Sequence, residues 1–128
     1  MPISLSVDHA EKKVFARAEG LISVGDIRLH LEGERAELGL SYSELIDARG
    51  YIPAFSAAEV RDIVAILRRL GESSRLVPTA VIVDTDLGYG MIRMLEILVG
   101  DVCAVRPFRD MEEGEQWLAR APQTDRSG

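Results

Sequence analysis

The sequence has a single cysteine, Cys103, and lacks both long apolar runs and an excess of positive charge. One cysteine cannot form an internal disulfide, and such a chain suits a reducing compartment. No apolar run approaches the roughly 18 residues of a membrane-spanning helix. The segment 1–8 carries no positive charge ahead of an apolar stretch, so we expect no signal peptide and a cytoplasmic protein.

Charge and composition further limit the class of protein to which this chain can belong. Lys and Arg number 15 against 21 Asp and Glu, a net charge of -6, and no basic stripe forms. Nucleic acid is therefore not an expected partner, because binding to phosphates depends on clustered basic side chains. A hydrophobic content of 47% and a length of 128 residues predict one folded domain with a real core. We assign residues 1–120 to that domain and 121–128 to a polar, frayed C-terminal tail.

Strands are predicted where apolar residues alternate or run together. Ile3, Leu5 and Val7 alternate with serines, and a second strand over 14–19 follows a polar turn, which indicates an antiparallel hairpin. Shorter strands are expected over 44–49 and 102–105. The uninterrupted apolar run 79–83 is typical of a central strand that is covered on both faces.

Helices are predicted between these strands. Ser23 with Asp26, and Ser56 with Glu59, have the spacing of capping boxes. Apolar residues recur at helical spacing after both, and Gly71 is expected to end the second helix. Two further helices are predicted over about 88–99 and 110–120.

The resulting order is β-β-α-β-α-β-α-β-α. This alternation predicts a single α/β domain with a mixed, mostly parallel five-stranded sheet covered by helices. The first strand is the antiparallel exception, at the margin of the sheet.

Three segments of this chain resemble the SpoIIAA-like family of small bacterial proteins, whose fold is of the STAS type. They are Leu45-Ile46-Asp47-Ala48-Arg49-Gly50, Ala80-Val81-Ile82-Val83-Asp84 with the helix after it, and the closing strand and helix from Val105 to Leu118. The resemblance implies the fold but no activity. Fold relatives include anti-sigma-factor antagonists, which bind a kinase and are switched by serine phosphorylation, and CRAL-TRIO domains, which carry apolar ligands.

A phosphoacceptor is the first candidate site. The antagonists carry Asp-Ser-Ser-Gly at the start of the helix after the third strand, and Ser56 stands at about that place. The local sequence is Phe55-Ser56-Ala57-Ala58, without the acidic residue, the second serine and the glycine. A simple helix cap is therefore the favoured interpretation of Ser56.

Polar residues at strand ends form the second candidate. Asp84 and Asp86 follow the central strand, where open α/β sheets place ligands, and could together hold Mg²⁺. The rest of such a catalytic set is missing, so we predict no metal, and Asp86 is also placed to cap the next helix. Asp47, Arg49 and Arg93 could extend a polar cluster there, with structural ion pairs as the favoured alternative.

The helix over 91–99 is the third candidate, because only Arg93 and Glu96 interrupt its apolar residues. Met91, Leu95 and Leu98 can face the sheet. A second apolar set then needs cover from a neighbouring helix, another subunit or a ligand. Its members are Ile92, Met94, Ile97 and Val99.

The remaining candidates are interpreted as structural. His9 and His30 are expected in solvent, Cys103 in the core, and Gly88 and Gly90 in a tight turn. We therefore predict a binding or regulatory module with no catalytic residues and no cofactor. It would act through a regulatory protein partner or a lipid-like apolar ligand, with a homodimer expected through residues 91–99. The alternative is a small metal-assisted enzyme that uses Asp84 and Asp86.

Overall fold

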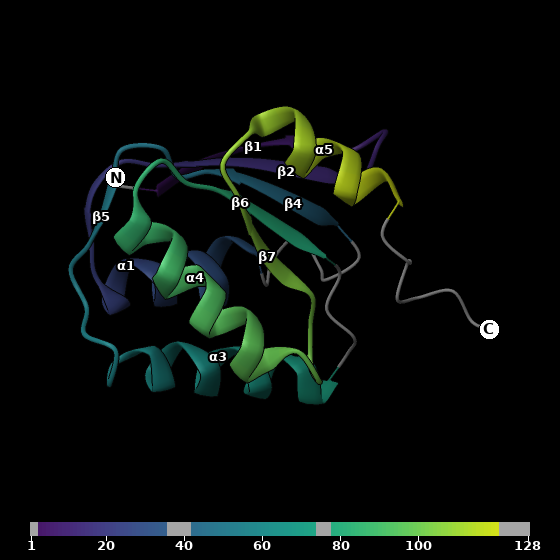
Figure 1. Cartoon of the computed structure of the whole chain (residues 1–128). Helices are drawn as coiled ribbons and strands as arrows, with labels where there is room; N and C mark the ends of the chain where they lie inside the picture. Colours follow the sequence, from purple (N-terminus) through teal and green to yellow (C-terminus); the bar gives the residue numbers. More distant parts are fainter. Residues whose placement is uncertain (1–2, 36–41, 74–77, 121–128) are drawn as a thin grey trace.

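A computed structural model describes residues 3–35, 42–73 and 78–120 of the chain. Five strands form the main sheet in the order β1-β2-β4-β6-β7 (Figure 1). Their bounds are β1 Ile3–Asp8, β2 Lys13–Ala18, β4 Ser43–Asp47, β6 Thr79–Ile82 and β7 Val105–Phe108. β1 pairs antiparallel with β2, and every other neighbouring pair is parallel. The predicted mixed, mostly parallel sheet is confirmed.

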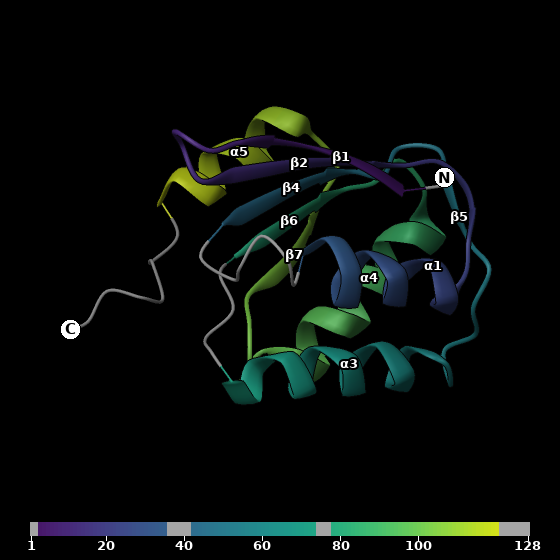
Figure 2. The ribbon, with the colours of Figure 1, turned by 180° about the vertical axis from the view of Figure 1, so that it is seen from behind.

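The helices cover the two faces of the sheet unequally. α1 (Val24–Leu29), which continues into the π-helix η1 (His30–Arg35), lies on one face with α3 (Val60–Ser73) and α4 (Asp86–Val99). In the described part of the chain, α5 (Met111–Arg120) is the helix that packs on the other face, against β4, β6 and β7. Figures 1 and 2 show this layering from opposite sides. We call the face under α1, α3 and α4 the inner face.

Strand β6 lies inside the sheet between β4 and β7, as the sequence predicted, and β7 is an edge strand. Ile82 is buried under α5, and Val81 is buried on the inner face. Pro107, which has no N–H to donate, lies in edge strand β7, where one side of the strand needs no partner.

Several predicted boundaries were wrong. The last strand begins at Val105 rather than at residue 102, because Val102 and Cys103 donate their N–H groups back to Val99 and close a turn after α4. α3 passes through Gly71 and continues to Ser73, so this glycine is not a C-cap. Gly88 and Gly90 lie within the first turns of α4 rather than in a tight turn, and Thr85, not Asp86, caps that helix.

A small second sheet was not predicted. β3 (Gly20–Ile22) pairs in parallel with β5 (Tyr51–Pro53) beside the end of the main sheet. Gly20 and Gly50 both have positive φ, a conformation that glycine adopts without steric cost, and Gly20 N–H donates to the Gly50 carbonyl at 3.1 Å. This ribbon connects β2 to α1 and places Tyr51 under the start of α4.

Candidate functional site

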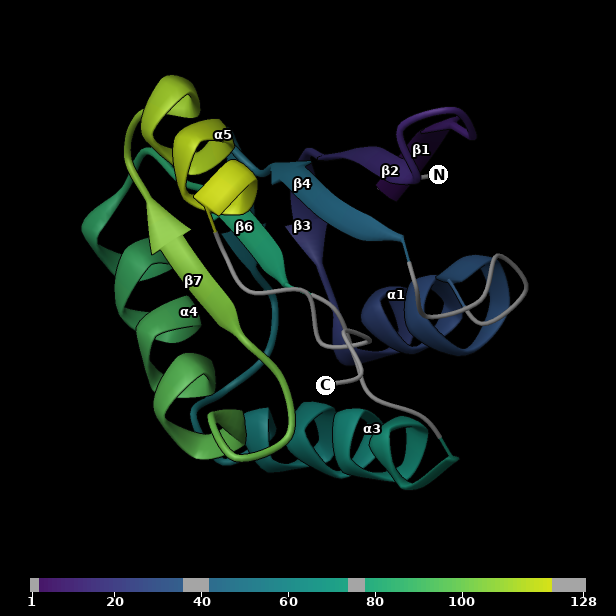
Figure 3. The same ribbon diagram turned by 90° about the vertical axis from the view of Figure 1, so that its right-hand side faces the viewer.

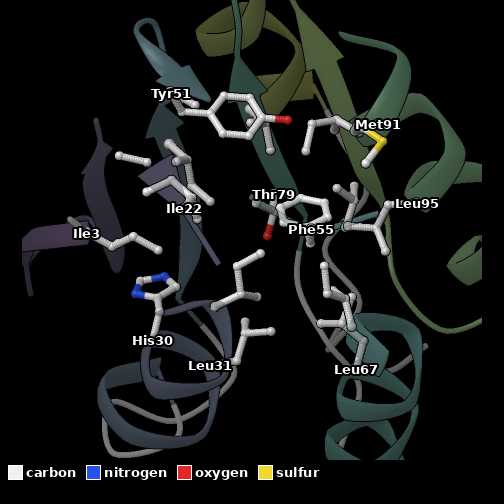
Figure 4. A pocket seen from close by; sticks show the side chains of 18 of the residues that line it. Ile3, Ile22, His30, Leu31, Tyr51, Phe55, Leu67, Thr79, Met91 and Leu95 are labelled. Atoms are coloured by element: carbon white, nitrogen blue, oxygen red, sulfur yellow. The ribbon is translucent and has the colours of Figure 1, made fainter. Parts of the chain in front are cut away.

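A cavity of about 120 Å³ lies between the inner face of the sheet and the helices α1, α3 and α4. Figure 3 shows these helices arranged around that face, and Figure 4 shows the side chains that point into the space. Almost the whole lining is apolar, and it draws on β1 through β7 and on all three helices. The lining residues are Ile3, Ala18, Ile22, Ile27, His30, Leu31, Glu44, Ile46, Ala48, Tyr51, Phe55, Val60, Ile63, Leu67, Thr79, Val81, Met91, Ile92, Leu95 and Val105.

Small residues on the sheet leave this space open. In parallel strands, residues that share a register point to the same face, so Ala16, Ile46 and Val81 form one row across the inner face. One row further along each strand stand Ala18 and Ala48, each contributing only a methyl group and both buried. Protein interiors otherwise leave few voids larger than a water molecule. This space is larger than such voids and is partly open.

A buried contact between a histidine and a carboxyl group forms part of the cavity wall. His30 Nε2 lies 2.7 Å from Glu44 Oε2, and the two residues are 5% and 2% exposed. The prediction that His30 is solvated was wrong. His30 is the first residue of η1, where the helix passes from α1 to the wider π form, and it faces β4. π-Helical turns are rare and often occur at functional sites.

Two hydroxyl groups complete the polar part of the lining. The Tyr51 hydroxyl donates to the Gly88 carbonyl at 3.2 Å, and burial raises the pKa of Tyr51 to about 12, so its phenol stays neutral. Thr79 is the register partner of Glu44 on the neighbouring strand. Figure 4 shows its hydroxyl directed into the space between the lining side chains.

The apolar helix predicted as a pocket or dimer contact is α4. Its apolar residues are distributed between the cavity, the core and the surface. Ile92 lines the cavity, together with Met91 and Leu95, which were expected to face the sheet. Val99 is fully buried in the core. Ile97 is 66% exposed and Met94 is half-buried, and neither lines the cavity. Leu98, expected to face the sheet, is 41% exposed instead.

The first part of the predicted polar cluster is a separate ion pair. Asp47 binds Arg49 through two bonds of 2.8 Å, and the Arg49 guanidinium holds the pKa of Asp47 below its ordinary value. Arg93 pairs with Glu96 on α4, 2.7 Å apart, and has no contact with Asp47 or Arg49. The favoured alternative, structural ion pairs, describes these contacts.

The two aspartates after the central strand also have separate partners. Asp84 accepts the N–H of Gly50 at 3.1 Å, and Asp86 binds Arg109 at 2.7 Å. Within residues 3–35, 42–73 and 78–120, no three His, Cys, Asp or Glu side chains come together as a metal site.

Ser56 lies outside the cavity, at the start of the turn that leads into α3. Its hydroxyl accepts the N–H of Glu59 at 3.2 Å, and the Glu59 carboxylate accepts the N–H of Ser56 at 2.8 Å. The predicted capping box is confirmed. The residue is exposed, and phosphorylation of it stays a prediction.

Most of the cavity was not predicted from the sequence. His30, Glu44, Thr79 and the contributions of α1 and α3 were missed. One signal was present: Glu44 and Thr79 are polar residues near the start of two largely buried strands, where a polar side chain needs a partner. Nothing in the sequence reveals that the two residues are neighbours.

The arrangement of five strands, with three helices on one face and one on the other, defines a SpoIIAA-like α/β fold. The structure is similar to the crystal structure of an uncharacterized DUF3478-family protein from Shewanella loihica PV-4, described as having a SpoIIAA-like fold. The TM-score is 0.58 at 16% identity, over 91% of this chain and 93% of that one. The predicted resemblance is thus confirmed at the level of the fold.

Sequence comparison adds no further relative. Neither a family model nor a curated protein matches the chain. In the described part of the chain, no helix has the length and apolar character needed to cross a membrane.

Proposed function

We propose that this protein is a binding module, without catalytic activity of its own, that holds one small apolar molecule in the cavity beneath α1, α3 and α4. The observation that carries the proposal is the cavity itself, about 120 Å³ in volume and almost wholly apolar. An empty apolar cavity costs stability, because its walls lose the contacts that a packed core would make. A bound molecule restores those contacts.

The volume indicates the size of the molecule. An engineered apolar cavity of about 150 Å³ binds benzene, so a cavity of 120 Å³ fits a molecule near the size of one aromatic ring. A complete acyl chain would need a larger space. We therefore narrow the lipid-like ligand expected from the sequence to a small ring or short branched compound.

Filling the cavity with a side chain tests the proposal. Ile46 lies on β4 and lines the cavity, so Ile46→Phe would occupy part of its volume. Ile52 lies on β5 and is 53% exposed, so Ile52→Phe makes the same chemical change outside the cavity. Toluene should raise the thermal midpoint of the wild type and of Ile52→Phe, and should have little effect on Ile46→Phe.

The size of the effect follows from linkage. A ligand present at 100 times its Kd stabilises the folded state by about 2.7 kcal/mol. If toluene and other ring-sized apolar probes leave the wild-type midpoint unchanged, or shift Ile46→Phe as much as the wild type, the cavity is not a binding site. Mass spectrometry of the purified protein under denaturing conditions would identify a molecule carried from the cell.

The metal-assisted enzyme has no comparable observation in its favour. Asp84 and Asp86 are both engaged by other groups, Gly50 N–H and Arg109 respectively. A titration with Mg²⁺ and Mn²⁺ checks this alternative, and saturable binding that is lost in Asp84→Asn would revive it.

Self-association through α4 also stays a prediction. Val99 and Ile92 are used within the subunit, which leaves Ile97 as the most exposed apolar side chain of the predicted set. Light scattering should show about twice the chain mass if the dimer forms, and Ile97→Glu should then return the mass to that of one chain.

A further inference from the structure

We infer that the molecule bound in the cavity is a small neutral alcohol or phenol, with its hydroxyl group against Thr79 and its apolar body toward Tyr51 and Met91. This inference rests on the proposed function and specifies its ligand class. The observation that supports the inference concerns the Thr79 hydroxyl. Among residues 3–35, 42–73 and 78–120 this hydroxyl has no hydrogen-bond partner, whereas the backbone N–H of Thr79 donates to Ala104.

Stability alone does not explain a threonine at this position. Thr79 begins the central strand and lines an apolar cavity, between Glu44 and Val105 of the neighbouring strands. Valine has the same shape, and the other inner-face residue of β6, Val81, is a valine. Thr79 is half-buried, and a hydroxyl that is partly withdrawn from water without a partner is unfavourable for folding. Residues that lower stability in this way are typical of binding sites.

The surroundings of Thr79 select the polar group of the ligand. Glu44, its register partner, brings carboxylate oxygens to the same wall, and the Tyr51 proton is directed to the Gly88 carbonyl. This wall therefore offers carboxylate oxygens, which accept, beside the Thr79 hydroxyl, which can donate. A ligand hydroxyl can donate to an acceptor on this wall and accept from Thr79, whereas a ketone could only accept.

Charge excludes ionised ligands. Among the described residues, the lining contains no Lys or Arg, and its one basic side chain, His30, is already 2.7 Å from Glu44. A carboxylate in the cavity would lose its hydration and face Glu44, with no Lys or Arg from the described part of the lining to compensate its charge, which is strongly unfavourable. Fatty acids and aromatic acids are therefore poor ligands, and neutral hydroxyl compounds are suited to the site.

Phenol, toluene and benzoate form a matched set of probes, because they share the ring and differ in one substituent. We would measure their dissociation constants at pH 7 by calorimetry with wild type, Thr79→Val and Thr79→Ser. Benzoate should not bind. The ratio of phenol to toluene affinity should fall about fivefold in Thr79→Val, the effect of one hydrogen bond, and should be retained in Thr79→Ser. Without ligand, Thr79→Val should also unfold at a higher temperature than the wild type.

The outcomes separate the two proposals. If phenol and toluene both bind but Thr79→Val leaves their ratio unchanged, the cavity is a binding site and the assignment of the hydroxyl is wrong. Binding of benzoate as tight as that of phenol would also overturn the neutral ligand class. If no probe binds to the wild type, the proposed function fails and this inference fails with it.

Discussion

Gly88 and Gly90 provide a direct test of how tightly α4 packs over the cavity. Both lie in the first turns of the helix, two residues apart, and neither has a positive φ. A Cβ added at Gly88 would stand 2.8 Å from Tyr51 Cε1 and 3.0 Å from Thr85 Oγ1. A Cβ added at Gly90 would meet nothing within 4 Å.

The magnitude follows from these distances. The Gly88 contact is about 0.7 Å shorter than an optimal carbon–carbon contact of ~3.5 Å. Tyr51 is a buried ring whose hydroxyl binds the Gly88 carbonyl, so it cannot move without losing that bond. Overpacking of this kind costs about 1–3 kcal/mol, which the higher helix propensity of alanine offsets by at most ~1 kcal/mol. At Gly90 only the propensity gain remains.

Gly88→Ala should therefore be less stable than the wild type by about 1 kcal/mol, and Gly90→Ala more stable by about 0.5–1 kcal/mol. Urea unfolding followed by circular dichroism measures both, and the thermal midpoints of the two variants should differ by roughly 6–7 °C. Equal stability of the two variants would refute the argument. The cost of Gly88→Ala should shrink in a Tyr51→Val background, because the clash is with that ring.

Three further predictions concern residues outside the cavity. Ser56→Ala should lower the free energy of unfolding by about 1 kcal/mol through loss of the cap, and an unchanged urea midpoint would contradict this. Asp47→Asn should cost about 2 kcal/mol at pH 7; because Arg49 lowers the folded-state pKa of Asp47 below its ordinary 3.8, the stability difference should persist at pH 5 and shrink as the pH falls below 4. Burial raises the pKa of Cys103 to about 11, so Ellman's reagent at pH 7 should label it only after unfolding, and rapid labelling of the native protein would show that it is accessible.

Most helices and strands of the fold could be predicted from local patterns in the sequence. Alternation at Ile3, Leu5 and Val7 predicted β1, and the apolar run at 79–83 predicted the central strand, because side-chain periodicity depends on backbone geometry alone. The capping boxes at Ser23 and Ser56 were confirmed for the same reason: each joins residues three apart.

The cavity was decided by tertiary structure. Its lining joins Ile3 to Val105, and its open space depends on the distance between helices and sheet, which no local pattern encodes. His30 illustrates the difference. By sequence it lies on the polar side of a helix, yet at the junction of α1 and η1 it is buried against Glu44, 14 residues away. Packing between segments that are distant in the sequence decides which side chains are buried at this site and which residues they contact. The helices and strands that hold these residues are determined by local sequence patterns.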